Sequence, residues 1–434
     1  MKLEKILSDI ETYLKENQTK SWTPGKDWVQ YAGPYFSSDE YVRAIKTLLE
    51  GWLVLGKDAL EFERIFPKEL GKKYGILTNS GSSSNLIMMK TLTSKRGMNL
   101  SPGTKVITPV AGFPTTINPI YQCSFEPVFV DIELPSLNLN LDQVENSEGA
   151  VLCFAHALGN PPDMGRVQDI MARKHMILIE DCCDALGSMY DNKPVGSFGK
   201  MSSCSFYPAH HITMGEGGFV ATDNKETEYI ARSFREWGRG CYCTGKEAGL
   251  SMKGSCGKRF QPWIKAFPDE IFDHKYIYEE IGYNLKPIEL QASIGLEQLK
   301  KLPEIKRLRI RNYNLLLKIF KKYEEFFYLP VATKKANPSW FTFPVTLKEK
   351  APFSRNALCT FLEENKIQTR PYFAGNVLLH PAYEHLMPTD EAKTRFPVAT
   401  YATLNTFFLG TSPVITPEKI DYIEQTLTEF FKKL

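Results

Sequence analysis

The 434-residue sequence has no long apolar run, and no uninterrupted stretch approaches the ~18 residues needed to cross a bilayer. It also has no excess of charge of one sign, since 53 Lys and Arg offset 50 Asp and Glu to a net charge of +3. Residues 1–20 contain no continuous apolar core, so they predict an amphipathic helix and not a signal peptide. We therefore expect a soluble, cytoplasmic protein that binds neither membrane nor nucleic acid.

Cysteine is scarce for a disulfide framework, with nine residues spread over the whole chain. Without a secretory signal, an odd number of cysteines indicates thiols, metal ligands or catalytic groups. The composition is otherwise ordinary for a globular protein, with 43% hydrophobic and 24% charged residues. At roughly 150 residues per domain, the length predicts about two to three domains.

Short β-rich runs alternate with helical stretches between residues 50 and 225. This alternation predicts an α/β fold with one large, mostly parallel sheet of seven strands. Helices expected at 82–93, 113–122, 166–174 and 226–237 would serve as crossover connections. The expected strands are 73–78, 105–110, 126–131, 150–155, 176–181, 202–206 and 218–222.

Residues 238–283 interrupt this alternation, being rich in Gly, Cys, Lys and aromatic residues without a sustained period. A loop of this length within a compact enzyme needs a functional reason. After Pro287, two helices are expected at 289–302 and 305–323. They lead into a mixed region that predicts a smaller C-terminal α+β domain.

Three polar segments follow predicted strands at the sheet edge where open α/β folds bind ligands. The Ser-rich stretch 78–85 follows one strand and opens a helix, which is typical of a phosphate site, although a serine-capped helix alone explains it too. Asp181 ends another strand, where its carboxylate could hold a proton on a pyridine nitrogen. Phe113 follows a third strand and is a candidate to stack on a flat ring, with a core position as the alternative.

These segments together resemble the vitamin B6-dependent sugar aminotransferase (DegT/DnrJ/EryC) family, from about residue 30 to the C-terminus. The resemblance is carried by Ser80-Gly-Ser-Ser, Gly112-Phe-Pro-Thr-Thr, Glu180-Asp with Ala185-Leu-Gly, and Ser205-Phe-Tyr-Pro with Gly215-Glu-Gly-Gly. It implies an aspartate aminotransferase-like fold of type I. The division it implies is an N-terminal helical segment 1–45, a large cofactor-binding domain 46–300 including the loop 238–283, and a small C-terminal domain 301–434.

The resemblance also implies a homodimer that binds pyridoxal or pyridoxamine 5'-phosphate, with Asn284 reaching the cofactor phosphate of the partner subunit. The cofactor-binding residues that it implies within one chain are Gly81, Ser82, Ser83, Phe113, Asp181 and Ser205. Further candidates for contacts with the sugar, the ring or the nucleotide diphosphate are His156, Asn160, Arg370 and Lys286. Trp340 and Phe341 could form part of a sugar or base wall, but an aromatic core position is favoured for both.

The lysine that forms a Schiff base with the cofactor in most family members is replaced here by His210. Without an ε-amine the aldehyde form cannot be held covalently, so pyridoxamine phosphate is the expected resting cofactor. Histidine is a competent base near neutral pH, and His211 should point away from the site. This exchange resembles the pyridoxamine-dependent sugar 3-dehydratases, which implies C3 dehydration of a nucleotide-linked 4-keto-6-deoxyhexose with His210 as base and Tyr207 beside the cofactor. A packing role for Tyr207, and a catalytically inactive protein, remain the alternatives.

Four cysteines decide between branches of that family. Cys183 and Cys241 are separated by 57 residues, Cys241 and Cys243 by one, and Cys243 and Cys256 by twelve. This pattern resembles the iron-sulfur CDP-4-keto-6-deoxyglucose 3-dehydratases of dideoxysugar and lipopolysaccharide O-antigen biosynthesis, although residues 244–252 look like an insertion. It implies a 2Fe-2S cluster on these four thiolates and a partner reductase with NADH, flavin and its own iron-sulfur centre. Cys182 is a competing ligand.

Two alternatives stay open at this point. One is a cluster-free 3-dehydratase that regenerates pyridoxamine phosphate with glutamate. The other is a non-catalytic, zinc-containing protein that binds sugar nucleotides, because four thiolates also hold zinc.

Overall fold

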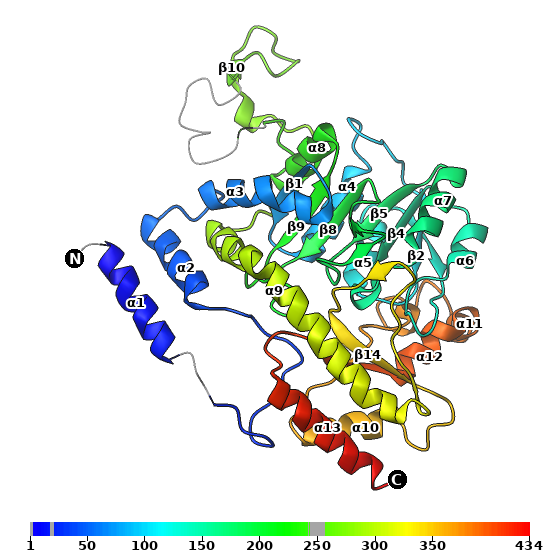
Figure 1. Ribbon diagram of the computed structural model, residues 1–434. Coiled ribbons are helices and arrows are strands. Elements are labelled where there is room, and N and C mark those ends of the chain that lie inside the picture. Colours follow the sequence, from blue (N-terminus) through cyan, green and yellow to red (C-terminus); the bar gives the residue numbers. More distant parts are fainter. Residues whose placement is uncertain (1–2, 18–20, 242, 244–256) are drawn as a thin grey trace.

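A computed structural model describes residues 3–17, 21–241, 243 and 257–434 (Figure 1). Cys256, one of the four predicted cluster ligands, lies outside these residues. Within the described ranges, every helix is too short or too polar to cross a membrane.

The seven predicted strands form one sheet in the order β1-β9-β8-β5-β4-β2-β3. All neighbours from β8 to β3 run parallel, and β9 runs antiparallel to both β8 and β1. The predicted seven-stranded, mostly parallel sheet is therefore confirmed. Its strands are β1 (Tyr74–Thr78), β2 (Lys105–Pro109), β3 (Glu126–Val130), β4 (Val151–Ala155), β5 (Ile177–Asp181), β8 (Met201–Ser205) and β9 (Gly218–Thr222).

Helices cover both faces of this sheet. Successive side chains of a strand point to opposite sides, so apolar strand residues on both faces need a covering layer. Ile76 packs in one core cluster and its neighbour Leu77 in another. The first face is covered by α4 (Gly81–Thr91), α5 (Pro114–Gln122) and α8 (Lys225–Arg235). The second is covered by α3 (Lys57–Ile65), α6 (Leu141–Asn146), α7 (Met164–Lys174) and the first half of α9.

One long helix, α9 (Glu289–Phe320), replaces the two helices predicted on either side of Pro303. The prediction of a break at this proline was wrong. Leu302 and Ile305 flank Pro303 and are both buried in the same core cluster, so packing holds the helix together across the missing N–H donor. The predicted domain boundary at residue 300 falls inside α9, which both parts of the chain share (Figure 1).

The C-terminal part has its own four-stranded sheet and its own core cluster, as expected for a smaller α+β domain. The sheet order is β12 (Phe327–Tyr328), β14 (Thr342–Leu347), β16 (Thr406–Gly410) and β15 (Arg370–Pro371). Its helices are α10 (Arg355–Glu364), α11 (Thr389–Arg395), α12 (Pro397–Asn405) and α13 (Pro417–Phe431). A small sheet of β13 (Ala336–Asn337), β6 (Met189–Tyr190) and β7 (Lys193–Pro194) links it to the large part.

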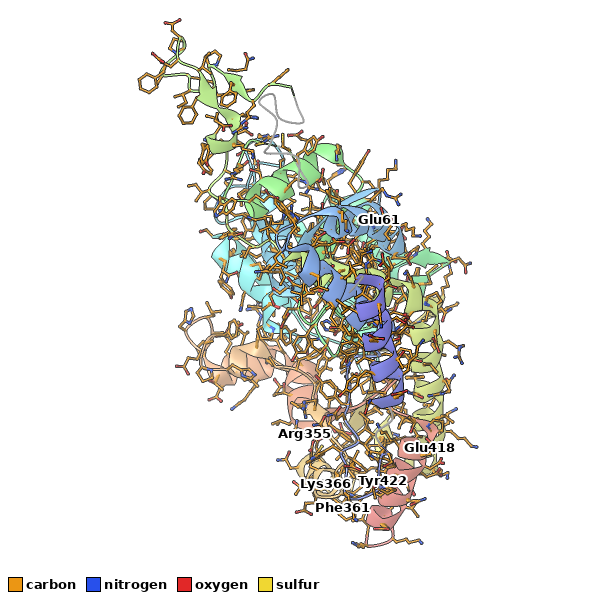
Figure 2. All side chains as sticks on the ribbon, turned by 90° about the vertical axis from the view of Figure 1, so that its left-hand side faces the viewer. Glu61, Arg355, Phe361, Lys366, Glu418 and Tyr422 are labelled. Carbon is orange, nitrogen blue, oxygen red and sulfur yellow. The ribbon has the colours of Figure 1, made fainter. Side chains whose placement is uncertain are left out.

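The chain between α1 (Leu3–Asn17) and α2 (Ser38–Glu50) reaches across to the C-terminal part. We call residues 21–37 the N-terminal strap. Val29 pairs with Ile367, and the ring of Trp22 lies 5.7 Å from that of Tyr422. Figure 2 shows Tyr422 close to Lys366, whose carbonyl accepts a hydrogen bond from the Val29 N–H at 2.7 Å.

Within the predicted irregular loop 238–283, the described residues 257–283 form an arm that projects beyond α8 (Figure 1). Its root is held by bridges from Glu236 to Asn284 and from Arg239 to Tyr278. The described part of the arm carries one hairpin, made of β10 (Phe260–Gln261) and β11 (Phe272–Asp273), and a short 3-10 turn.

Candidate active site

A cavity of about 740 Å³ opens at the carboxyl ends of the parallel strands. Strands β2, β4, β5 and β8 each end at its wall, as expected for ligand sites of open α/β sheets. Nine predicted site residues line it, namely Gly81, Ser82, Ser83, Phe113, Asp181, Cys183, Ser205, Tyr207 and His210. Residues distant in sequence are thus brought to one place.

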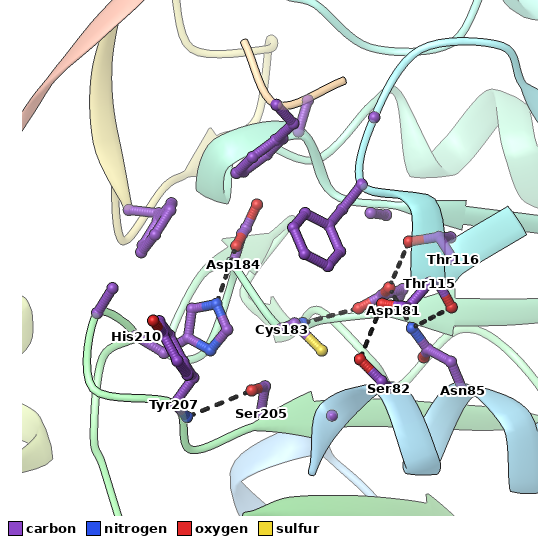
Figure 3. A pocket seen from close by; sticks show the side chains of 18 of the residues that line it. Ser82, Asn85, Thr115, Thr116, Asp181, Cys183, Asp184, Ser205, Tyr207 and His210 are labelled. Carbon is purple, nitrogen blue, oxygen red and sulfur yellow. Dashed lines mark hydrogen bonds and ion pairs between the residues drawn. The ribbon is translucent and has the colours of Figure 1, made fainter. Parts of the chain in front are cut away.

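The Asp181 carboxylate is buried and held by four hydrogen-bond donors. Figure 3 shows Asp181 with Asn85, Thr116 and Cys183 around it. Its Oδ2 accepts from Asn85 Nδ2 and Thr116 Oγ1, both at 2.7 Å. Its Oδ1 accepts from the Cys183 N–H at 3.0 Å and from Ser203 Oγ at 3.4 Å. Charge-assisted bonds of this kind keep a carboxylate in one orientation, which suits a partner for a protonated pyridine nitrogen.

The start of α4, residues 80–83, forms a polar corner of the cavity, which we call the α4 corner. Ser80 caps the helix, its Oγ accepting from the Ser83 N–H at 3.1 Å. A Cβ on Gly81 would lie 2.4 Å from the Ser205 Cβ, so only glycine lets the helix start approach the end of β8. Ser82 Oγ lies 3.1 Å from Thr115 Oγ1. Open backbone N–H groups and hydroxyls at a helix N-terminus fit a phosphate group.

Phe113 is unlike the phenylalanines of the core because half of it is exposed, at 50%, while it lines the cavity. Its ring contacts Phe373 edge-on, with the ring centroids 5.7 Å apart. An accessible aromatic face in this position is suited to stacking on a flat ring. Together, the Asp181 carboxylate, the α4 corner and this ring fit pyridoxamine or pyridoxal phosphate.

His210 is paired with Asp184, a residue that the sequence analysis did not single out (Figure 3). The His210 Nε2 lies 3.4 Å from Asp184 Oδ1, and its Nδ1 has no hydrogen-bond partner among the described residues. Burial raises the pKa of the Asp184 carboxyl, and His210 opposes that rise. With Nε2–H directed at the carboxylate, Nδ1 carries the lone pair and is the basic atom.

The loop that carries His210 is held from behind by Arg309, a fully buried side chain of α9. Its Nη2 donates to the carbonyls of Ala209 and His210 at 3.1 and 2.9 Å, and its Nη1 donates to the Phe341 carbonyl at 2.8 Å. Burial lowers the pKa of this guanidinium. Arg309 thus ties the His210 loop to the C-terminal sheet.

Replacing Arg309 with Met should destabilise the protein by about 2–4 kcal/mol, because three carbonyls would lose their donor in a buried place. Urea unfolding of the two proteins measures this difference. The matched control is Arg307→Met on the same helix, whose side chain is 67% exposed and should change stability by less than about 0.5 kcal/mol. Equal stability of R309M and R307M would contradict this role.

Several other predicted contacts are not made. His156 is fully buried with Nε2 3.1 Å from Glu180 Oε2, and Asn160 bonds to the carbonyl of Val331, so neither reaches the cavity. Trp340 stacks on Tyr313 in the C-terminal core at 4.2 Å. Trp340 thus has the aromatic core position that was favoured for it. The contacts expected of His156 and Asn160 were wrong, because position after a strand does not determine which side of the sheet a side chain faces.

Other predictions hold. Phe341 and Arg370 do line the cavity, and His211 points away from it, with Nε2 2.7 Å from the Ser339 carbonyl oxygen. Asn284 does not line the cavity of its own chain and bonds to Lys286 Nζ at 2.8 Å. Its expected role in a partner subunit therefore stays a prediction.

The residues that sequence reasoning missed are Asn85, Thr116, Asp184 and Tyr31. Asn85 and Thr116 belong to the same sequence segments as Ser82 and Phe113. Their side-chain amide and hydroxyl groups can donate hydrogen bonds, which could have indicated that they bind the Asp181 carboxylate. Asp184 lies three residues after Asp181 and carried a similar signal. Tyr31 carried none, since it reaches the cavity from a segment far from the sheet strands.

The predicted cysteine ligands are only partly placed. Cys183 lines the cavity, and Cys241 and Cys243 lie at the start of the loop 238–283. The sulfur atoms of these three cysteines do not all lie within 4.8 Å of one another. Within the described ranges, the only three potential metal ligands that lie this close together are His156, Glu180 and Cys182. A tetrahedral zinc site needs sulfur atoms about 3.8 Å apart, so the described cysteines form no ready zinc site. This distance does not test a 2Fe-2S site, because ligands on the two irons of such a cluster lie further apart than ligands on one metal.

Comparison with known proteins agrees with this geometry. Residues 35–428 match the family described as the DegT/DnrJ/EryC1/StrS aminotransferase family. The chain belongs to that family. The predicted fold of type I, with a smaller C-terminal domain, is thereby confirmed.

Three relatives are particularly informative. The chain is 39% identical to the lipopolysaccharide biosynthesis protein RfbH of Salmonella typhimurium, over 99% of this chain and 98% of that protein. It is 38% identical to the dTDP-4-dehydro-2,6-dideoxy-D-glucose 3-dehydratase of Saccharopolyspora spinosa, over 99% and 92%. A crystal structure of GDP-4-keto-6-deoxymannose-3-dehydratase with a trapped PLP-glutamate geminal diamine superposes with a TM-score of 0.77 at 26% identity, covering 92% of this chain and 99% of that one.

Proposed function

We propose that this protein removes the C3 hydroxyl of a nucleotide-linked 4-keto-6-deoxyhexose, using bound pyridoxamine phosphate. The observation that carries the proposal is His210, which stands where the family has its lysine. One of its ring nitrogens is directed at Asp184, and the other is buried without a hydrogen-bond partner among the described residues. Two relatives described as 3-dehydratases, of a dTDP-linked and a GDP-linked sugar, support it. The sequence resemblance favours CDP as the nucleotide.

The chain's own residues have separable tasks in this reaction. When bound, pyridoxamine phosphate supplies an amine for the 4-keto group and a ring that accepts electrons. Asp181 holds a proton at the ring nitrogen, and Phe113 and the α4 corner orient the ring and its phosphate. His210 Nδ1 takes a proton, and Asp184 stabilises the imidazolium that forms. Tyr207, whose ring lies 5.9 Å from that of His210, is placed to contact the sugar.

The activity test is direct. The protein loaded with pyridoxamine phosphate is incubated with the CDP-, GDP- and dTDP-linked 4-keto-6-deoxyhexoses. Mass spectrometry follows the sugar, which should lose one oxygen as hydrogen replaces the C3 hydroxyl, and the cofactor, which should be converted to pyridoxal phosphate with release of ammonia. We expect this deoxygenation with at least one of the three sugars, and fastest with the CDP sugar. No deoxygenation with any of them, from a folded and cofactor-loaded protein, would contradict the proposal.

For the reductive form of the reaction, we propose that electrons enter through a 2Fe-2S cluster on Cys183, Cys241, Cys243 and Cys256. A reductase with NADH, flavin and its own iron-sulfur centre would supply them. The support is the cysteine spacing and the position of Cys183 two residues after Asp181.

Iron and acid-labile sulfide in anaerobically purified protein test this cluster. We expect about two of each per chain and an electron paramagnetic resonance signal on reduction with dithionite. Cys241→Ser should remove the signal, whereas the control Cys359→Ser, in the C-terminal part, should keep it. A protein without iron or sulfide after reconstitution would contradict the cluster.

A second candidate is favoured by the glutamate adduct of the solved relative. In this form the dehydratase needs no cluster and regenerates pyridoxamine phosphate with glutamate. Repeated turnover that depends on glutamate and not on a reductant would select it. The homodimer with Asn284 from the partner is part of either form.

A further inference from the structure

The N-terminal strap begins before the family region and contributes a wall of the cavity. The matched region starts at residue 35, and Tyr31 precedes it. The strap is fixed on both sides of Tyr31, by the pairing of Val29 with Ile367 and by the Tyr35 carbonyl, which accepts from Gln298 at 2.9 Å. A Cβ on Gly410 would lie 1.8 Å from the Tyr31 carbonyl oxygen, so the strap crosses β16 in direct contact.

The Tyr31 side chain reaches from this strap to the cavity wall. It lies beside Arg370 of β15, whose guanidinium carbon is 4.8 Å from the centre of the Tyr31 ring. Phe408 packs on the same ring at 6.0 Å between centroids, so the ring is held between the sheet and the guanidinium. A cation over an aromatic face is attracted by the ring and is restricted in orientation.

Arg370 is the only lysine or arginine among the described residues that line the cavity. One of its N–H groups donates to the neighbouring Thr369 carbonyl at 2.7 Å. Within the described part of the chain, no carboxylate forms an ion pair with it. A guanidinium has five N–H donors, so most of them remain for a ligand, and their planar arrangement matches phosphate oxygens.

The charge of the cavity is otherwise negative, from Asp181, Asp184 and Glu216. The carboxylates of Asp181 and Asp184 have assigned partners, whereas no carboxylate among the described residues pairs with Arg370. The serines expected to hold the cofactor phosphate come from α4 and β8, which are different elements from β15. The cavity therefore has a second place for an anionic group.

We propose that Tyr31 is a positioning residue for substrate binding, whose ring holds the Arg370 guanidinium at the cavity wall, where it binds the diphosphate of the nucleotide-linked sugar. The inference rests on the proposed function only for the identity of that substrate. The binding of an anionic diphosphate by Arg370, and the dependence of that binding on Tyr31, are measurable without any turnover.

The test is calorimetric titration of CDP, GDP, dTDP and inorganic pyrophosphate into protein loaded with pyridoxamine phosphate. Arg370→Met should weaken nucleoside diphosphate binding by about 10–100-fold, as expected for lost charge-assisted hydrogen bonds. Tyr31→Leu should weaken it by about 3–30-fold, and Tyr31→Phe, which keeps the ring, by less than about twofold. Tyr35→Phe is the matched control on the same strap, because the Tyr35 hydroxyl contacts Glu304 and does not line the cavity.

A double mutant separates positioning from simple loss of structure. If Tyr31 acts through Arg370, adding Tyr31→Leu to Arg370→Met should cost no further affinity. Wild-type diphosphate affinity in both single variants would overturn the proposal. So would fully additive losses, or loss of pyridoxamine phosphate from R370M, which would assign the arginine to the cofactor. Normal diphosphate binding without water loss from the 4-keto sugar would overturn the proposed function and leave this inference intact.

Discussion

His210→Asn should lower the rate of water loss from the 4-keto sugar by about 10²–10⁴-fold, the range contributed by a positioned general base. An asparagine side chain keeps a polar group near Asp184 but has no basic nitrogen at neutral pH. Proton transfer would therefore fail while the cavity stays intact. The measurement is exchange of the cofactor's methylene hydrogen with deuterated solvent in the presence of substrate, followed by mass spectrometry.

The control for this variant is His175→Asn. His175 is an exposed residue at the end of α7 with a φ of 53°, a conformation that asparagine also adopts. It should leave both exchange and stability unchanged. Asp184→Asn should give an intermediate loss, because Nε2–H would keep a hydrogen-bond acceptor but the imidazolium would lose its counter-charge. Retained exchange in H210N with cofactor bound would remove His210 from the role of base.

His210→Lys adds a readout that needs no substrate. If His210 occupies the position of the family's lysine, the new ε-amine should form a Schiff base with pyridoxal phosphate. Borohydride reduction would then leave the cofactor covalently attached to the peptide that contains residue 210. A cofactor that is removed by dialysis after reduction would show that the side chain at position 210 does not reach it.

Asp181→Asn should weaken cofactor binding and lower the rate by about 10²–10³-fold, as expected when a preorganised electrostatic partner is lost. The carboxylate accepts from Asn85, Thr116, the Cys183 N–H and Ser203. An amide at this position must direct its own N–H₂ group at one of these donors. That mismatch would add about 1–3 kcal/mol of destabilisation.

Cofactor affinity and stability of D181N can be measured separately, by absorbance titration and by urea unfolding. The control is Asp169→Asn, an exposed carboxylate on α7. It should change neither quantity. If D181N binds pyridoxamine phosphate as tightly as the wild-type protein and turns over at the same rate, Asp181 is not the partner of the ring nitrogen.

The sequence by itself determined the large sheet and the ring and phosphate pocket. Strand periodicity is a local property, since runs such as β4 and β9 are buried on both faces and are mostly apolar along their length. Gly81, Phe113, Asp181 and His210 each directly follow or end a strand, and the carboxyl ends of parallel strands meet at one edge. Their convergence needed no tertiary information beyond the direction of the sheet.

The tertiary structure decided what depends on contacts between distant segments. Whether Pro303 ends a helix was settled by the buried residues on either side of it, because packing outweighed the local preference for a break. His156 was excluded from the cavity because it lies on the Glu180 side of the sheet. Asp184, Arg309 and Tyr31 reach His210 and the cavity from a loop, a helix and the strap, and only the folded chain brings these together, since no spacing in the sequence encodes such contacts.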